Sequence, residues 1–289
     1  MRFKLESAIH LIVGLSITTT LLTGCGLTPK QISMTQSFGQ ATTNISKLGD
    51  EFVNIRNGII EMNQALVSID TRKTARDFKF DRPASPEATA TRIAATKALK
   101  SYGELLVELV TKGRTENLKK VANSFSMNTK AALKKNVTGS IDKIVSGLGA
   151  LWLEHKKAAA VKDIITTYEQ PVNQLADLLI EDFSLDDSAF GYIKTYHTTA
   201  KRLKNASMRL VNADAKERER ALQALVLSEK AISRANEINK NAKEAIIGFK
   251  KANIELVKMV NTEIYSADSV KAYNTQIQEM VNIYQVLNP

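Results

Sequence analysis

The chain has 289 residues, a formal net charge of +10 and a single cysteine. One cysteine excludes a fold stabilised by intrachain disulfides, so the hydrophobic core has to stabilise the protein alone. Five prolines and 13 glycines are few for this length, and aromatic residues make up only 6% of the chain. This composition favours helices over a β-sandwich.

The N-terminal segment has the three parts of a secretory signal. A short basic start precedes an apolar run over 8–22, and small residues follow that run. The run is shorter than the roughly 20 apolar residues that a membrane-spanning helix needs. It ends in Leu22-Thr23-Gly24-Cys25, which resembles the lipobox of bacterial lipoproteins. An ordinary signal peptide that happens to end in a cysteine, or an uncleaved anchor, is the alternative interpretation.

The resemblance implies that 1–24 are a cleaved signal peptide and that Cys25 becomes the first residue of the mature chain. Its thiol would carry a diacylglycerol, and its amine a further acyl chain such as palmitate. Each buried methylene contributes about 0.8 kcal/mol, so two or three chains hold a protein on a membrane almost permanently. The residue after the cysteine is Gly26 rather than Asp, which in the lipoprotein family implies delivery to the outer membrane if the host has two membranes.

The predicted export to the cell envelope also affects how the basic charge of the chain is interpreted. A basic excess is typical of nucleic-acid binding, but an exported lipoprotein does not meet intracellular nucleic acid, so we expect no nucleic-acid partner. Anionic lipid, lipopolysaccharide and cell-wall glycan are the acidic neighbours that the envelope offers. Alternatively, the charges only solvate helix surfaces.

The rest of the chain is predicted to be helical. We expect 25–29 to form a short lipidated tether and 30–289 to form one helical bundle domain. Apolar residues recur three and four positions apart, which is the pattern of one buried stripe on each helix. The predicted segments are 30–69, 86–112, 115–135, 141–183, 188–211, 216–264 and 269–287.

Local signals set several boundaries of these segments. Ser85 and Pro86 are typical of a helix start, and residues 186–188 (Asp, Asp, Ser) are expected to cap the next helix. Pro171 predicts a kink or a break near Glu169. At about 1.5 Å per residue, a helix over 216–264 spans roughly 74 Å. The sequence therefore predicts an all-α fold, an elongated bundle of about six helices with long, coiled-coil-like antiparallel packing.

No motif in the sequence indicates a catalytic or metal site. His155 and His197 lack the Glu-x-x-His spacing of a di-iron bundle, because positions 152 and 194 hold Trp and Lys. Phosphate-binding loops and a nucleophile elbow are missing from the sequence as well. We therefore expect no enzyme activity, no catalytic residues, no cofactor and no metal.

One acidic cluster is an alternative candidate for a metal site or a catalytic site. Glu181, Asp182, Asp186 and Asp187 lie together in the sequence. Such a cluster can hold a hard cation or supply paired carboxylates for glycan hydrolysis. The simpler interpretation is that these charges flank a helix junction.

The clearest candidate for binding is the basic-aromatic loop, residues 71–84. Its cations could meet phosphates while its two phenylalanines insert at a lipid interface or stack on a sugar. Alternatively, the loop is a solvated connector whose phenylalanines pack on the bundle. The candidate residues are Arg72, Lys73, Arg76, Phe78, Lys79, Phe80 and Arg82.

A second apolar stretch lies at 144–153 and is hydrophobic on several faces. Ten residues cannot span a bilayer. We expect a central buried helix segment there, with a membrane-inserting tongue as the alternative.

These observations predict a lipid-anchored protein of the bacterial cell envelope that acts through interaction rather than catalysis. Its helix faces would make it a scaffold, an adaptor or an accessory subunit with a protein partner, while Cys25 holds it on the membrane. A binding module for anionic lipid, lipopolysaccharide or cell-wall glycan is the second hypothesis. An envelope glycan hydrolase is the third and weakest.

Overall fold

The computed structural model describes residues 26–69, 84–111, 117–134, 154–186, 191–212, 214–262 and 265–287. Across these ranges the chain forms helices and turns without a strand, so the predicted all-α bundle is confirmed. None of the helices in the described ranges is long and apolar enough to cross a bilayer. The helices are α2 (Pro29–Thr43), η1 (Asn44–Ser46), α3 (Lys47–Ile69), α4 (Pro86–Val110), α5 (Leu118–Leu133), α7 (Glu154–Asp182), α8 (Tyr192–Leu210), α9 (Ala215–Thr262) and α10 (Asp268–Leu287).

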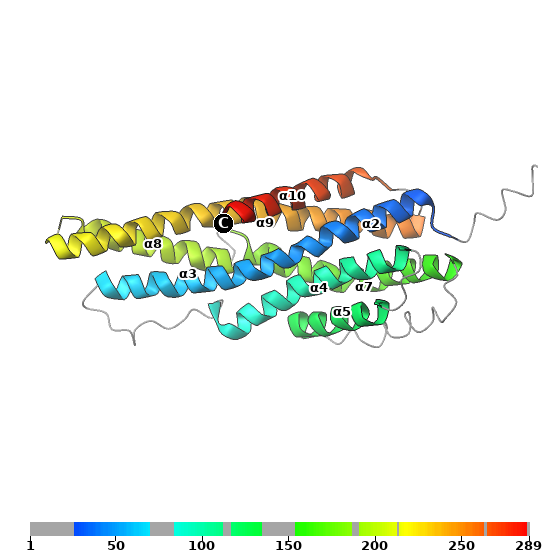
Figure 1. Cartoon of the computed structure of the whole chain (residues 1–289), viewed down its shortest axis with the longest axis horizontal. Helices are drawn as coiled ribbons and strands as arrows, with labels where there is room; N and C mark the ends of the chain where they lie inside the picture. The colour runs from blue at the N-terminus through cyan, green and yellow to red at the C-terminus, as the bar shows by residue number, and fades with distance from the viewer. Residues whose placement is uncertain are drawn as a thin grey trace, which may run out of the picture.

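The bundle is elongated and built around α9 (Figure 1). With 48 residues, α9 spans about 72 Å. Helices α2 and α3 follow one another along the long axis, as do α7 and α8, and α9 packs against both pairs. At one end, α3, α8 and the first half of α9 form the three-helix end. At the other, α2, α4, α5, α7, α10 and the second half of α9 form the six-helix end.

Contacts along α9 show that its neighbours run antiparallel to it. Residues early in the α2–α3 pair meet the C-terminal part of α9, and later ones meet its middle: Gln31 contacts Met259, whereas Glu51 contacts Arg234. Along the α7–α8 pair, Asp177 binds Lys250 and Lys204 binds Glu229. The long antiparallel packing expected from the apolar spacing of 216–264 is therefore present.

One predicted boundary is confirmed and two predictions are wrong. The Ser85 hydroxyl caps α4 by accepting from the backbone N–H of Ala88 at 3.1 Å. The predicted single helix over 30–69 is instead interrupted by η1. Residues 186–188 do not cap α8, which begins after Gly191. A Cβ at Gly191 would clash with the backbone at the end of α7, so the close approach of these two helices determines where α8 starts. Pro171 lies inside α7 and does not end the helix.

A row of aromatic rings crosses the six-helix end, with one ring from each of its six helices. Neighbouring ring centroids are 5.2–6.3 Å apart, within the range in which aromatic pairs stabilise a core. The hydroxyl of Tyr102 donates to Asn253 Oδ1 at 3.0 Å, and that of Tyr273 donates to Thr42 Oγ1 at 3.1 Å. Each of these two buried hydroxyl groups therefore has a hydrogen-bond partner. In order, the row is Tyr273 (α10), Phe249 (α9), Phe38 (α2), Tyr102 (α4), Phe125 (α5) and Tyr168 (α7).

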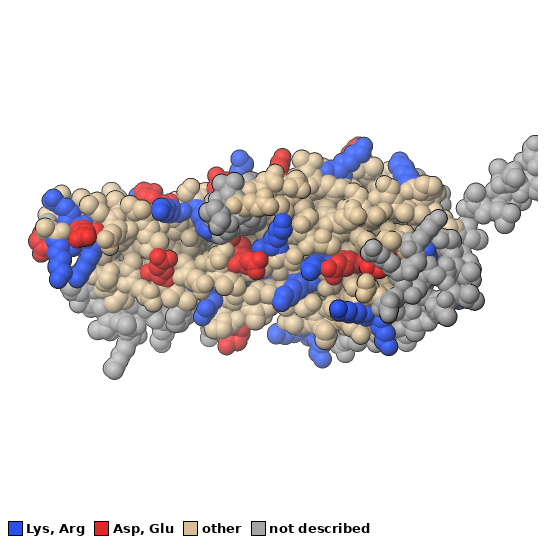
Figure 2. Space-filling model, viewed as in Figure 1, with Lys and Arg blue, Asp and Glu red and all other residues tan. Residues whose placement is uncertain are grey.

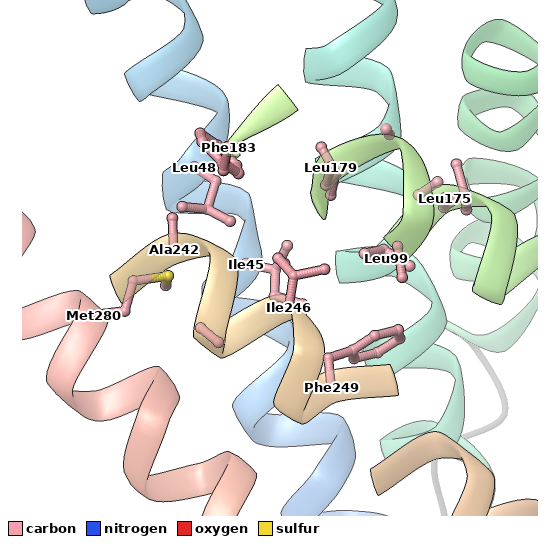
Figure 3. Packing of buried hydrophobic residues seen from close by; sticks show 14 of the residues in the cluster. Ile45, Leu48, Leu99, Leu175, Leu179, Phe183, Ala242, Ile246, Phe249 and Met280 are labelled. Carbon is pink, nitrogen blue, oxygen red and sulfur yellow. The ribbon is translucent and has the colours of Figure 1, made fainter. Parts of the chain in front are cut away.

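Aliphatic side chains fill the core around the row. They belong to one continuous cluster that extends from Met34 to Val281. Figure 3 shows side chains of α3, α4, α7, α9 and α10 converging, among them Leu48, Leu99, Leu179, Ile246 and Met280.

The crossing of α2 and α4 depends on two glycines. A Cβ at Gly39 would lie 2.6 Å from the carbonyl oxygen of Gly103, and a Cβ at Gly103 would lie 2.5 Å from that of Gly39. Backbone therefore packs on backbone here, which brings the adjacent Phe38 and Tyr102 into an edge-to-face contact.

We predict that Gly39→Ala and Gly103→Ala each destabilise the protein by about 1–3 kcal/mol, because the added methyl would overpack a backbone contact. This loss would occur although alanine has the higher helix propensity. Gly49→Ala is the matched control, since its Cβ would meet the Thr96 side chain at 3.0 Å rather than backbone. Urea unfolding measures all three variants, and equal stability of Gly103→Ala and Gly49→Ala would contradict the prediction.

Candidate functional site

Several predicted site residues lie outside the described part of the chain. They include the lipidation site Cys25 and the seven candidate residues of the basic-aromatic loop, Arg72, Lys73, Arg76, Phe78, Lys79, Phe80 and Arg82. The apolar stretch 144–153 and Asp187 also lie outside it. The structure does describe the residues that flank these segments, and these place the segments' attachment points along the rod.

The chain enters the bundle at the six-helix end. Thr28 caps α2 through a capping box with Gln31, in which each side chain accepts from the other residue's backbone N–H. The ammonium of Lys30 lies 5.1 Å from the ring centroid of Tyr265. Gly26 is thus separated from the start of α2 by two residues, and the residue before it joins the protein at this end.

Two members of the acidic cluster, Asp182 and Asp186, form separate ion pairs. Asp182 is 2% exposed and accepts from Arg92 Nε at 2.8 Å and from Arg92 Nη2 at 3.2 Å. Burial raises the pKa of the Asp182 carboxyl, and Arg92 opposes that rise. The arginine also lies 5.5 Å from the ring centroid of Tyr192. Asp182 therefore ties the end of α7 to α4 and to the start of α8.

Asp186 faces a different helix. Its Oδ2 accepts from Lys243 Nζ at 2.8 Å and from the Ser184 hydroxyl at 2.7 Å. These hydrogen bonds lower the pKa of Asp186. The neighbouring backbone N–H of Leu185 donates to Asn239 Oδ1 at 2.9 Å. This half of the cluster therefore ties the α7–α8 connection to α9.

A second buried ion pair lies at the base of the three-helix end. Arg234 of α9 donates from Nε and Nη2 to the two carboxylate oxygens of Glu51 at 2.9 and 2.8 Å. Glu51 is 1% exposed. The pair joins α3 to α9 through both oxygens of the carboxylate.

His197 has no acidic partner among the residues that the structure describes. His197 lies on α8, and its pKa is lowered by partial burial and by the charges of Lys201 and Lys194. His155 belongs to α7, and its side chain is outside the described part of the structure. Within the described ranges, no three His, Cys, Asp or Glu side chains are close enough together to hold a metal ion.

An open groove lies at the three-helix end, between α3 and α9. Its volume is about 430 Å³. Polar and apolar residues both line it, and Glu61 and Arg220 carry opposite charges on its two walls. The lining residues are Glu61, Gln64, Ala65 and Ser68 of α3 with Arg220, Gln223, Ala224 and Leu227 of α9.

Exposed apolar side chains lie at the same end of the rod. Leu222 and Val226 are 46% and 55% exposed on α9, and Met208 of α8 is 57% exposed. The sequence spacing indicates this exposure. Leu222 and Val226 are four residues apart and lie off the buried stripe of α9, and no helix in the described part of the chain covers them.

Comparison with protein-family models, with curated proteins and with solved structures gave no match to this chain. The function of this chain is therefore inferred from its own residues and from where the fold places them.

We predict that Arg92→Met lowers the free energy of unfolding by about 3–5 kcal/mol at pH 8, because it leaves the buried Asp182 without its cation. Lys250→Met is the matched control. It breaks a half-exposed pair with Asp177, which is worth about 1 kcal/mol or less. The double variant Arg92→Met/Asp182→Asn should recover part of the loss.

The effect of Arg92→Met should depend on pH. Removing the arginine leaves burial to raise the pKa of Asp182 further above its unfolded value of 3.8. The folded variant then keeps a proton that the unfolded chain has lost, so the unfolding free energy falls as pH rises through the folded pKa. Denaturant titrations at pH 5 and pH 8 should give the smaller deficit at pH 5. The same deficit at both values would show that Asp182 does not cause the loss.

Proposed function

We propose that this protein is a lipid-anchored, non-catalytic scaffold or accessory subunit of the bacterial cell envelope. Acylated Cys25 would hold its six-helix end on the membrane, and the three-helix end would bind a protein partner. In a host with two membranes, the outer membrane is the proposed address. The observation that carries this proposal is that exposed Leu222 and Val226 lie on the three-helix end, at the opposite end of the rod from the start of α2, from which Gly26 is separated by two residues.

The short tether supports an anchored end close to the bilayer. Because Thr28 already caps α2, only Gly26 and Leu27 separate the cysteine from residues that are fixed to the bundle. From Pro29 to Ile69, α2, η1 and α3 rise about 60 Å at roughly 1.5 Å per residue. A rod of this length would carry the three-helix end well away from the anchor.

The composition of the three-helix end supports a protein partner. Single exposed apolar residues are normal on any protein surface. Here Leu222 and Val226 lie at the same end as a groove that contains Arg220. Arginine is enriched in protein interfaces, so this end fits a helical or extended segment of a partner.

The second candidate function is a module that binds anionic lipid, lipopolysaccharide or cell-wall glycan through the basic-aromatic loop. This proposal rests on the composition of the loop, which follows the end of α3 at Ile69 and lies outside the described part of the chain. The weakest alternative, a glycan hydrolase, is disfavoured because Asp182 and Asp186 each bind a cation from another helix.

We predict that Cys25→Ala abolishes acylation and makes the protein extractable from membranes by high salt, because the acyl chains supply the part of the membrane affinity that salt does not weaken. Gly26→Ala is the matched control and keeps the acylated cysteine. Metabolic labelling with palmitate, followed by membrane fractionation, measures both variants. Continued labelling of Cys25→Ala would contradict the proposal that this cysteine is acylated.

We further predict that a photo-cross-linker at Val226 captures one discrete protein in living cells. The same cross-linker at Ile254, an exposed apolar position on the six-helix half of α9, should not capture it. Mass spectrometry of the adducts is the measurement. The scaffold proposal fails if position 226 gives no adduct, or if both positions give the same one.

A further inference from the structure

Helix α8 differs from its neighbours in charge. It contains no acidic residue, and its sequence YIKTYHTTAKRLKNASMRL includes five basic ones. By contrast, acidic and basic side chains are interspersed over the face of the molecule seen in Figure 2. The basic residues of α8 are Lys194, Lys201, Arg202, Lys204 and Arg209.

Most of these cations lie on the outer face of α8, opposite its buried stripe. Lys194, Lys201 and Met208 are seven residues apart, which places them on one line along the helix. Arg202 and Arg209, also seven apart, run beside that line. All of them are exposed except Lys194, which is partly buried. We call the surface of Lys201, Arg202, Met208 and Arg209 the basic face of α8.

The basic face keeps its charge largely unneutralised. Lys204 pairs with Glu229 at 2.6 Å, and Lys194 donates to the backbone carbonyl of Leu185 at 3.1 Å. Lys201, Arg202 and Arg209 make no ion pair with any residue that the structure describes. The lowered pKa of His197, to which burial and the charge of Lys201 contribute, is consistent with a positive potential here.

We propose that the basic face of α8 docks on an anionic bilayer surface. Lys201, Arg202 and Arg209 would meet lipid phosphates, and the exposed Met208 between them would enter the headgroup region. A cationic helix face with an apolar side chain is the arrangement that binds anionic membranes. The 19 residues of α8 give a straight contact line of about 28 Å, which suits an extended flat surface.

Docking through α8 would be a second membrane contact, separate from the proposed acyl anchor. Helix α8 and Gly26 lie at opposite ends of the rod (Figure 1). The acyl chains would therefore hold one end and α8 the other. Docking by α8 does not require acylation, so the two ideas can fail separately.

The test uses residues 26–289, which keep the whole core because its members lie between Met34 and Val281. Flotation with phosphatidylglycerol-containing vesicles should show binding that weakens as salt rises. Pure phosphatidylcholine vesicles should show none. Each cation near an anionic surface is worth about fivefold in binding, so the triple variant Lys201→Gln/Arg202→Gln/Arg209→Gln should lose about a hundredfold.

A control triple variant separates this face from net charge alone. Lys240→Gln/Lys251→Gln/Lys271→Gln removes the same charge from exposed positions on α9 and α10 and should keep most of the binding. Equal losses in both triple variants would overturn the proposal. So would absence of binding to phosphatidylglycerol vesicles, including the case in which the chain binds soluble polyphosphate instead.

Discussion

The backbone contact between Gly39 of α2 and Gly103 of α4 is the constraint on which the six-helix end depends. Two helices can approach this closely only where neither has a side chain at the crossing. The approach places Phe38 and Tyr102 edge to face, and the aromatic row continues from them in both directions, to Phe249 on one side and Phe125 on the other. Aromatic contacts thus connect all six helices of this end without a disulfide, in a chain whose single cysteine is at position 25.

The three-helix end is held differently, because fewer helices share its core. Here the buried pair of Glu51 with Arg234 fixes α3 to α9. Between the two ends, the pair of Asp182 with Arg92 fixes the α7–α8 junction to α4. Desolvation offsets much of the attraction within such buried pairs, so they add little stability. Their main effect is to specify which helices pack together. The surface of the three-helix end carries a groove, exposed apolar residues and the basic face of α8.

Much of the helical organisation could be predicted from the sequence, because a buried stripe repeats along α9 at the helical period. The interruption at η1 was missed because hydroxyl side chains compete for backbone carbonyls there: Thr43 donates to Gln40 and Ser46 to Thr43. The partners of the acidic cluster could not be predicted. Arg92 and Asp182 are 90 positions apart, and apolar periodicity does not say which helices are neighbours. The groove was missed for the same reason, since its two walls come from distant segments.

One continuous rod separates the six-helix end, which Gly26 adjoins, from the three-helix end. The most direct test is a pulsed electron spin resonance distance between spin labels on α9, at Lys216→Cys and Asn261→Cys, in residues 26–289. The only native cysteine is then absent, so labelling is specific to the two exposed sites. An unbroken α9 predicts one narrow distribution near about 68 Å. A broad distribution, or one centred well below that distance, would show that α9 bends or breaks and would contradict the account.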